Sequence, residues 1–373
     1  SLFNVPLKIA RIRNRNYLAP MWRSLYRKDH LPIDYIISPE YEVAKAILSR
    51  LHVPGAMDTI DFADRLLKVI EVRCEKDFPL QNLTLAEMKE LYPSLTMNIM
   101  AIARDGVPFL PKLTDKLKVG DEIFFVADQK QVSSIMPLFG HDEVEARRLI
   151  IIGGGNIGYM LAEELVKEED NLNIKLIEMS TERAEYIAGK VSGITVINGN
   201  ALDREIMMEA GIQSSETVIA ITDDDEVNIL ACILAKKNGC KRSVCLINKG
   251  RSYLPLISSL GIDVDVNPRE TTVSTILQHI RKGKVRGAHT LYSGSMEIIE
   301  TEAISGSTVI GKTVSDLELP MDVRISAIVR ADNEVLIPDE STMIKQNDRI
   351  LIMCKTEKTS LVDNIFSDNT AYF

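Results

Sequence analysis

The segment from Leu149 to Glu178 constrains the fold more than any other part of the chain. Residues 149–152 are four consecutive apolar residues, which is typical of a parallel strand buried on both faces. Glycines at 153, 155 and 158 follow at once, and a helical pattern of apolar residues comes next. A second apolar strand, 173–177, ends at Glu178. This order of strand, glycine turn, helix and strand predicts an α/β fold with a doubly wound parallel sheet.

Each glycine in this turn has a physical reason to be there. Gly153 permits the tight turn, Gly155 lets the backbone approach a pyrophosphate, and Gly158 lets the helix pack closely on the strand. Asn156 and Ile157 begin the helix, whose free N–H groups and partial positive charge attract phosphate. The pattern is that of a Rossmann-like nucleotide-binding lobe. A degenerate Rossmann lobe that binds nothing is the alternative.

Glu178 lies at the expected end of the second strand, where it would meet the ribose of a bound nucleotide. A carboxylate there accepts hydrogen bonds from the ribose hydroxyls and repels a 2′-phosphate. The sequence therefore favours NAD(H) or an adenine nucleotide over NADP(H).

Two more apolar segments, 195–197 and 218–221, predict the third and fourth strands. Ligands in open α/β sheets lie at the carboxyl ends of the strands, so the residues after these segments are further candidates for contact with the nucleotide. These candidates are Asn200, Ala201, Thr222 and Asp223. The acidic run 223–226 also suits the start of a helix, and we favour that capping role for the run as a whole.

The chain repeats itself at an offset of 262 − 33 = 229 residues, where Ile33–Pro39 matches Ile262–Pro268. Farther along, 69–72 resembles 298–301, and each is followed by an apolar segment that we expect to be a buried helix, 80–91 and 309–319. Each copy then predicts a hairpin and a last strand. The hairpins turn at Asp105-Gly106 and at Asp332-Asn333, and the last strands begin near 122 and 349.

These repeats predict four domains. We expect residues 1–55 to be the C-terminal part of a first Rossmann lobe and 56–142 a small α+β subdomain. A complete Rossmann lobe, 147–285, and a second α+β subdomain, 286–373, follow. Shifting Leu149 back by the offset gives 149 − 229 = −80, before Ser1. We therefore expect the first lobe to be truncated and the chain to be a fragment of a longer protein. A natural short form is less favoured, because its sheet would have an open edge.

Charge and cysteine content narrow the function classes. The net charge is −9 and the pI about 5.3, which argues against a nucleic-acid partner. A basic stretch between Arg11 and Lys28 is the local exception, and we interpret it as a solvated face. The five cysteines include no C-x-x-C pair, which indicates reduced thiols in the cytosol rather than a zinc ribbon.

Two further classes are excluded by what the pattern lacks. The longest uncharged stretch, 149–162, is shorter than the ~20 apolar residues of a membrane span. We expect no transmembrane helix and no signal peptide. Hydride transfer needs an acid or base beside the nicotinamide. We find no Tyr-x-x-x-Lys pair, no catalytic triad order and no clear metal-ligand set. We therefore expect no catalytic residues, no metal site and no enzymatic activity.

The chain resembles the TrkA family, the peripheral cytosolic subunits of bacterial Trk potassium-uptake systems. The resemblance covers essentially all of the sequence, and its segments are 9–14, 150–158, 199–203 and 222–228. The order of the four domains is similar to the tandem RCK (KTN) arrangement of that family, in which each Rossmann-like lobe is followed by a C-terminal subdomain.

The resemblance implies a function as well as a fold. TrkA-like proteins assemble into a homo-oligomeric ring beneath a membrane potassium-translocating subunit of the TrkH/TrkG type, on the cytoplasmic face of the plasma membrane. They bind NAD(H), ATP and ADP as regulatory ligands. The implied nucleotide contacts are Gly153, Gly155, Asn156, Ile157, Gly158, Glu178, Asn200, Ala201, Thr222 and Asp223. Arg11 matches a basic position near the phosphates of the first lobe, whose glycine loop and ribose acid are absent here.

We therefore expect a nucleotide-binding regulatory subunit that gates a Trk-type potassium transporter. A soluble NAD-dependent oxidoreductase is one alternative, and an RCK regulator of another cation channel or antiporter is a second. Those other regulators usually carry one lobe–subdomain unit per chain, so the tandem repeat favours the Trk system. If the resemblance failed, a nucleotide-binding assembly protein of unknown partner would remain.

Overall fold

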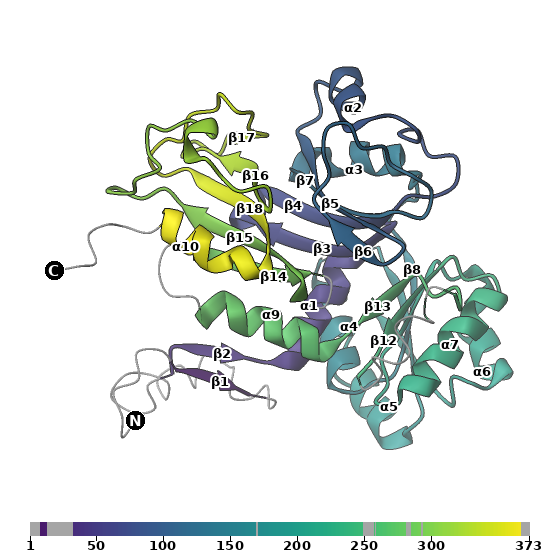
Figure 1. Ribbon diagram of the computed structural model, residues 1–373. Coiled ribbons are helices and arrows are strands. Elements are labelled where there is room, and N and C mark those ends of the chain that lie inside the picture. Colours follow the sequence, from purple (N-terminus) through teal and green to yellow (C-terminus); the bar gives the residue numbers. More distant parts are fainter. Residues whose placement is uncertain are drawn as a thin grey trace. The chain divides into compact units, whose positions relative to one another are not determined.

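The computed structural model describes residues 8–12, 33–168, 171–248, 257, 259–280, 285–291 and 294–366. The chain forms two compact units, and each is made of two separate segments (Figure 1). Residues 1–54 and 144–276 make the first unit, and 55–143 and 277–373 make the second. Most of the basic stretch between Arg11 and Lys28 lies outside the described residues.

The first unit contains a six-stranded parallel sheet with the order β10-β9-β8-β11-β12-β13. This is the doubly wound arrangement that the glycine segment predicts. The chain adds strands outward from β8 in one direction and then outward from β11 in the other, so the order of strands reverses between β8 and β11. The strands are β8 (Arg148–Ile152), β9 (Asn173–Glu178), β10 (Ile194–Asn198), β11 (Thr217–Ala220), β12 (Arg242–Leu246) and β13 (Val264–Val266).

Alternate residues of β8 face two separate cores, which explains why its apolar run is continuous. Leu149 and Ile151 belong to one core, and Ile150 and Ile152 to the other. Helices cover both faces of the sheet. They are α4 (Asn156–Glu168) and α5 (Thr181–Ala188) on the first core, and α6 (Arg204–Glu209) and α7 (Asp225–Lys237) on the second.

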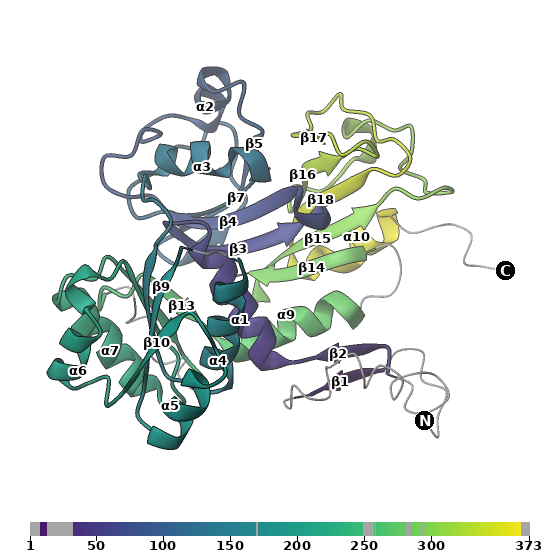
Figure 2. The same cartoon turned by 180° about the vertical axis from the view of Figure 1, so that it is seen from behind.

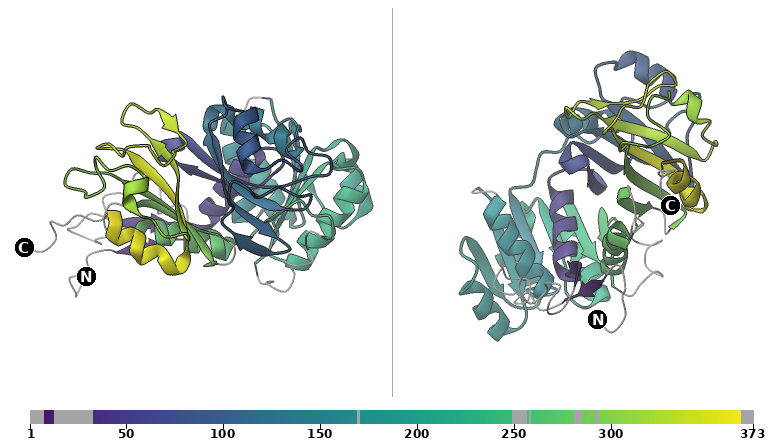
Figure 3. Two further views of the ribbon diagram at one scale, coloured as in Figure 1. Left: turned by 45° about the horizontal axis from the view of Figure 1, so that its top comes forward. Right: turned by 90° about the vertical axis from the view of Figure 1, so that its left-hand side faces the viewer.

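A helix from the first segment of the chain completes this unit. α1 (Pro39–Leu51) runs beside α4, and it contributes Val43, Ile47 and Leu51 to the core beneath α4 (Figure 3, right). It follows β2 (Tyr35–Ile37), which pairs in parallel with β1 (Ile9–Arg11) in a separate two-stranded sheet. The corresponding helix of the second repeat, α9 (Pro268–Ile280), follows β13. The repeat at offset 229 is therefore a structural repeat of strand and helix.

The second unit contains two five-stranded antiparallel sheets with equivalent strand orders, β3-β4-β7-β5-β6 and β14-β15-β18-β16-β17 (Figure 2). They share one apolar core, to which Val69 and Phe124 come from the first sheet and Ile298 and Leu351 from the second. The strands of the first sheet are β3 (Ala56–Phe62), β4 (Leu67–Arg73), β5 (Met97–Arg104), β6 (Val107–Phe109) and β7 (Glu122–Asp128). Those of the second are β14 (Val285–Leu291), β15 (Met296–Glu302), β16 (Val323–Val329), β17 (Val335–Leu336) and β18 (Arg349–Lys355).

The predicted hairpins are confirmed in both sheets. β5 pairs with β6 across Asp105 and Gly106, which have φ of 53° and 76°. β16 pairs with β17, and in that turn Asn333 has φ of 68°. Short helices close each sheet, α3 (Val132–Ile135) in the first and α10 (Thr359–Phe366) in the second. α10 packs on the second sheet through Val362 and Phe366 (Figure 3, left).

The two predicted buried helices differ from expectation. In 80–91 only α2 (Leu85–Leu91) is helical, and the prediction for 309–319 is wrong, because that segment holds a single 3-10 turn, Ser315–Leu317. The second copy begins like the first: Thr313 and Asp316 bond each other's backbone as Thr84 and Glu87 do. It stops at once because Pro320 follows, and proline disfavours helix at the residue before it.

Candidate functional site

The glycine loop connects β8 to α4 at the carboxyl edge of the parallel sheet. Gly153 has φ of 103°, and a Cβ built there would lie 3.0 Å from the backbone nitrogen of Thr222. A Cβ on Gly158 would lie 2.0 Å from the carbonyl oxygen of Gly153. A Cβ on Gly155 would meet nothing within 4 Å. The first and third glycines are therefore required by packing, and the second faces open space.

Glu178 ends β9, the strand next to β8, and its carboxylate binds the loop. The backbone N–H of Gly154 donates to its Oε2 at 2.7 Å, and that of Ser180 donates to its Oε1 at 2.8 Å. Each oxygen keeps a lone pair that can accept a hydrogen bond from a ligand hydroxyl. Glu178 therefore holds the glycine loop in place in addition to its expected position beside a ribose.

Thr222 follows β11, the strand on the other side of β8. It is held by a residue that the sequence did not single out. The buried side chain of Asn228 accepts from the N–H and the hydroxyl of Thr222, each at 2.8 Å. Its amide donates to the carbonyl oxygens of Thr222 at 3.1 Å and of Leu246 at 3.0 Å. Asn228 thus ties the ends of β11 and β12 together. A polar residue at the helical spacing of the buried Ile229, Cys232 and Ala235 was the signal in the sequence.

The acidic run caps α7, as we favoured. Asp224 is the N-cap residue, and its carboxylate accepts from the N–H of Val227 at 2.9 Å. Asp225 is buried and accepts from the N–H of Asn248 at 2.7 Å. Asp223 is exposed at the same edge of the sheet and remains available to a ligand.

The other predicted residues lie around the same edge. Asn156 and Ile157 form the first turn of α4, beside Gly155. Asn200 follows β10, two strands from β8, and its side chain accepts from the N–H of Leu202 at 3.0 Å, while Ala201 is buried. A second residue that the sequence did not single out, Asn198, binds the carbonyl oxygens of Glu178 and Met179 at 2.9 and 3.1 Å.

Arg11 stands apart from this group. It ends β1 in the separate two-stranded sheet, where it pairs with Ile37. Within the described part of the chain, no hydrogen bond or ion pair links Arg11 to the ten residues of the second lobe. The structure therefore brings together the glycine loop, Glu178 and Thr222, with Asn200 and Asp223 along the same edge, and it does not add Arg11 to them.

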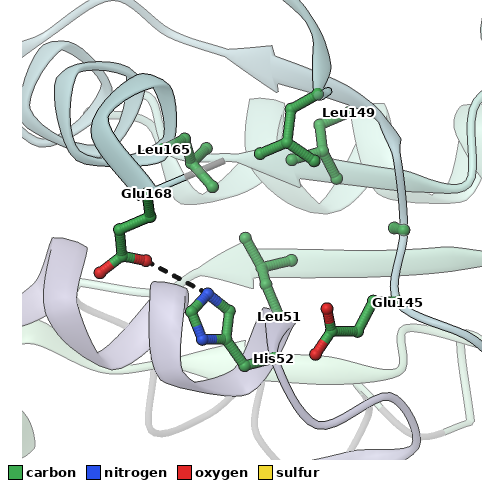
Figure 4. A pocket seen from close by; sticks show the side chains of 8 residues that line it. Leu51, His52, Glu145, Leu149, Leu165 and Glu168 are labelled. Atoms are coloured by element: carbon green, nitrogen blue, oxygen red, sulfur yellow. Dashed lines mark ion pairs between the residues drawn. The ribbon is translucent and has the colours of Figure 1, made fainter. Parts of the chain in front are cut away.

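A pocket in the first unit lies at the opposite edge of the sheet (Figure 4). It is lined by Leu149 at the start of β8 and by Leu165 and Glu168 near the end of α4. His52 points toward Glu168 across it, with 3.2 Å between Nε2 and Oε2. Because the glycine loop is at the other end of β8, this pocket is not the expected nucleotide site.

The chemistry of the remaining side chains adds no second site. All five cysteines are buried free thiols, and burial raises the pKa of Cys74 to about 12. Among the residues that the structure describes, no cluster of three or more histidine, cysteine or carboxylate side chains is arranged to hold a metal ion. Over the same residues, every helix is too short or too polar to cross a bilayer.

Two protein-family models match three segments of the chain. The family model for the TrkA-N domain matches residues 149–268, and that for the TrkA-C domain matches 69–140 and 298–367. The Trk system potassium uptake protein TrkA of Azorhizobium caulinodans is 42% identical over 373 residues, which is 100% of this chain and 81% of that protein. TrkA of Vibrio alginolyticus is 35% identical over 361 residues, 96% of this chain and 78% of that protein.

Solved structures share the fold. The RCK domain of GsuK aligns with a TM-score of 0.53 and 19% identity, covering 96% of this chain and 74% of that one. The GsuK channel bound to NAD aligns with the same TM-score of 0.53 and 17% identity, covering 96% and 62%. The tandem RCK arrangement expected from the sequence is therefore confirmed, and the chain belongs to the TrkA family of Trk-system potassium uptake proteins.

Proposed function

We propose that this chain is a nucleotide-binding regulatory subunit of a potassium uptake transporter. The observation that carries the proposal is the glycine loop, built between β8 and α4 with Glu178 bonded to it from the neighbouring strand. The ligands proposed are NAD(H), ATP and ADP, bound through the ten residues at the carboxyl edge of the sheet. Arg11 would belong to a site in the first lobe.

The phosphates of the nucleotide would lie at the first turn of α4. The first N–H groups of a helix have no partner within it, and the helix dipole adds partial positive charge there. Gly155 leaves the backbone open to the ligand. Two spare lone pairs on Glu178 would receive the ribose hydroxyls. These features recognise the adenosine diphosphate part that NAD(H), ADP and ATP share.

Regulation would follow from differential binding. A ligand shifts a conformational equilibrium only by the ratio of its affinities for the two states. We propose that a homo-oligomeric ring of these chains carries that shift to a TrkH/TrkG-like pore subunit, with the protein on the cytoplasmic face of the membrane. Family membership supports this assembly. The ligands act as effectors, and we expect no hydride transfer.

Equilibrium binding tests the proposal most directly. We expect the purified chain to bind NADH, ADP and ATP, and to bind NADH more tightly than NADPH because Glu178 repels a 2′-phosphate. Glu178→Gln should narrow that preference, since the amide keeps an acceptor and loses the charge. Glu185→Gln, on the exposed face of α5, is the matched control and should leave it unchanged.

Two further measurements separate the proposal from its alternatives. NADH absorbance followed over hours should stay constant, whereas steady oxidation with a metabolite would indicate an oxidoreductase. Potassium flux into vesicles that contain the pore subunit and this chain should change on addition of nucleotide. Flux that ignored every nucleotide, with the chain bound, would refute the regulatory role.

A further inference from the structure

Arg183 is a charged side chain that contacts the glycine loop from a neighbouring helix. It lies in the first turn of α5, five residues after Glu178. Its Nε donates to the carbonyl oxygen of Gly154 at 2.7 Å, and its Nη2 donates to that of Gly155 at 3.4 Å. One guanidinium therefore contacts two successive carbonyl groups of the loop, and the second of them also accepts from the N–H of Tyr159 at 3.0 Å, within α4.

Two tyrosines hold this guanidinium in place. It lies over the ring of Tyr159 from α4 at 5.5 Å and over that of Tyr186 from α5 at 5.0 Å. The hydroxyl of Tyr159 donates to Glu163 at 2.6 Å, which orients the first ring. The planar guanidinium can stack on aromatic rings and donate from its edge at the same time, which an ammonium group cannot do.

The direction of the two carbonyl groups determines where the opposite ends of the same peptides point. In a trans peptide the C=O and N–H bonds point in opposite directions. Because Arg183 binds the carbonyl of Gly154, the N–H group of Gly155 points away from α5. The helix hydrogen bond from Tyr159 to the Gly155 carbonyl sets the direction of the Asn156 N–H. Glu178 fixes the preceding peptide from its other end, through the N–H of Gly154.

We propose that Arg183 is a positioning residue for phosphate recognition: it orients the Gly155 N–H group toward the phosphates before a nucleotide arrives. This inference rests on the proposed function, and it deepens it. Arg183 acts through the peptide groups of the loop and not as a direct charge on the phosphates. A loop held in its binding geometry does not have to be ordered on binding, so affinity increases.

The test compares ADP with adenosine, which lacks phosphates, on wild type, Arg183→Met and Arg183→Lys. Arg183→Met loses the charge-assisted hydrogen bond that orients the loop, so its affinity for ADP should fall by about tenfold. Its affinity for adenosine should stay within about twofold of the wild-type value. Arg183→Lys should recover part of the loss, because lysine donates to one carbonyl only. Lys190→Met, which removes an exposed charge beyond the far end of α5, is the control and should bind like wild type.

Salt concentration distinguishes orientation from direct charge. The ratio of wild-type to Arg183→Met affinity for ADP should stay constant between about 50 and about 300 mM KCl, since screening acts on charge–charge attraction and not on peptide orientation. A ratio that fell toward one with salt would show a direct contact and overturn the inference. Equal losses for ADP and adenosine, or no loss, would also overturn it.

Hydrogen exchange of the ligand-free protein gives a readout that does not depend on binding. Amides of residues 153–157 should exchange faster in Arg183→Lys and Arg183→Met, while the amides of β8 and β11 stay as protected as in wild type. Unchanged exchange in the loop would contradict the inference even if affinity fell. Failure of the wild type to bind ADP would refute the proposed function and the inference together. If the wild type binds ADP and Arg183→Met binds it equally well, the inference alone is refuted.

Discussion

The two antiparallel sheets of the second unit repeat the same buried aspartate, but the arginine beside it binds it differently in each copy. Asp121 in the first sheet and Asp348 in the second each follow a tight turn, and each is 1% exposed. Arg104 binds both oxygens of Asp121, Nε to Oδ1 at 2.8 Å and Nη2 to Oδ2 at 2.7 Å. Arg330 binds only Oδ2 of Asp348, and Oδ1 has no hydrogen-bond partner among the described residues.

This difference shows that the two copies keep the same backbone turn before the aspartate while the electrostatic environment of the carboxylate changes. In both copies the aspartate Oδ2 accepts from the N–H three residues earlier, Lys118 at 2.9 Å and Lys345 at 2.7 Å, so the turn is the same. Burial raises the pKa of Asp348, because the one-sided contact compensates less of the lost hydration. The pKa of Arg104 is raised by its hydrogen bond to Asp121. The same residue type thus fills the same place under different electrostatic conditions.

The largest expected effect on the free energy of unfolding comes from removing the carboxylate charge of Asp121 or of Asp348. Asp121→Asn should destabilise the second unit by about 2 kcal/mol more than Asp348→Asn does. The amide NH2 introduced at position 121 must face a donor of Arg104, whereas at 348 it can take the place of the unpartnered Oδ1. Urea unfolding followed by circular dichroism measures both. Arg104→Met and Arg330→Met complete the two double-mutant cycles, and equal costs at the two positions would refute the distinction.

A smaller effect tests the turn that the copies share. Gly120 and Asn347 precede the two aspartates, with φ of 85° and 65°. Alanine at either position should cost about 1 kcal/mol, because a Cβ is strained in the left-handed region. Exchanging the residues, Gly120→Asn and Asn347→Gly, should cost less, since asparagine and glycine tolerate that conformation. Thermal unfolding gives the comparison, and an exchange as costly as alanine would show that the turns are not equivalent.

The smallest effect is a dependence on pH. Because the folded-state pKa of Asp348 is raised, its contribution favours folding below the ordinary carboxyl pKa and is lost as pH rises through the raised value. Lowering the pH from 7 toward 4 should therefore shift the difference in unfolding midpoint between wild type and Asp348→Asn in favour of wild type. A difference that stayed constant across that range would contradict the cause assigned to the pKa.

Most of the fold could be predicted because the patterns involved are local. The apolar run at 149–152, the glycines that follow it and the positive-φ turn at Asp105-Gly106 each depend on a few neighbouring residues. The prediction of a helix at 309–319 was wrong because it followed the pattern of apolar residues. It gave too little weight to Pro320 and to the glycine at 311, whose φ is 79°. The packing of α1 into the core formed by residues 144–276 was not predicted. The spacing of apolar residues shows which face of a helix is buried, but it does not show which sheet that face covers.

The sequence by itself determined the family and the doubly wound parallel sheet, and it predicted the residues that a nucleotide would meet, because spacing and residue type carry these signals directly. Only the tertiary structure decided what holds that edge together. Asn228 joins two strand ends, Glu178 binds the N–H of Gly154, and Arg183 binds the loop's carbonyls from another helix. These contacts join groups up to 29 residues apart whose meeting depends on how helices pack on the sheet. The spacing of residues along the chain does not specify such packing. The contacts of these three side chains are therefore known only from the folded protein.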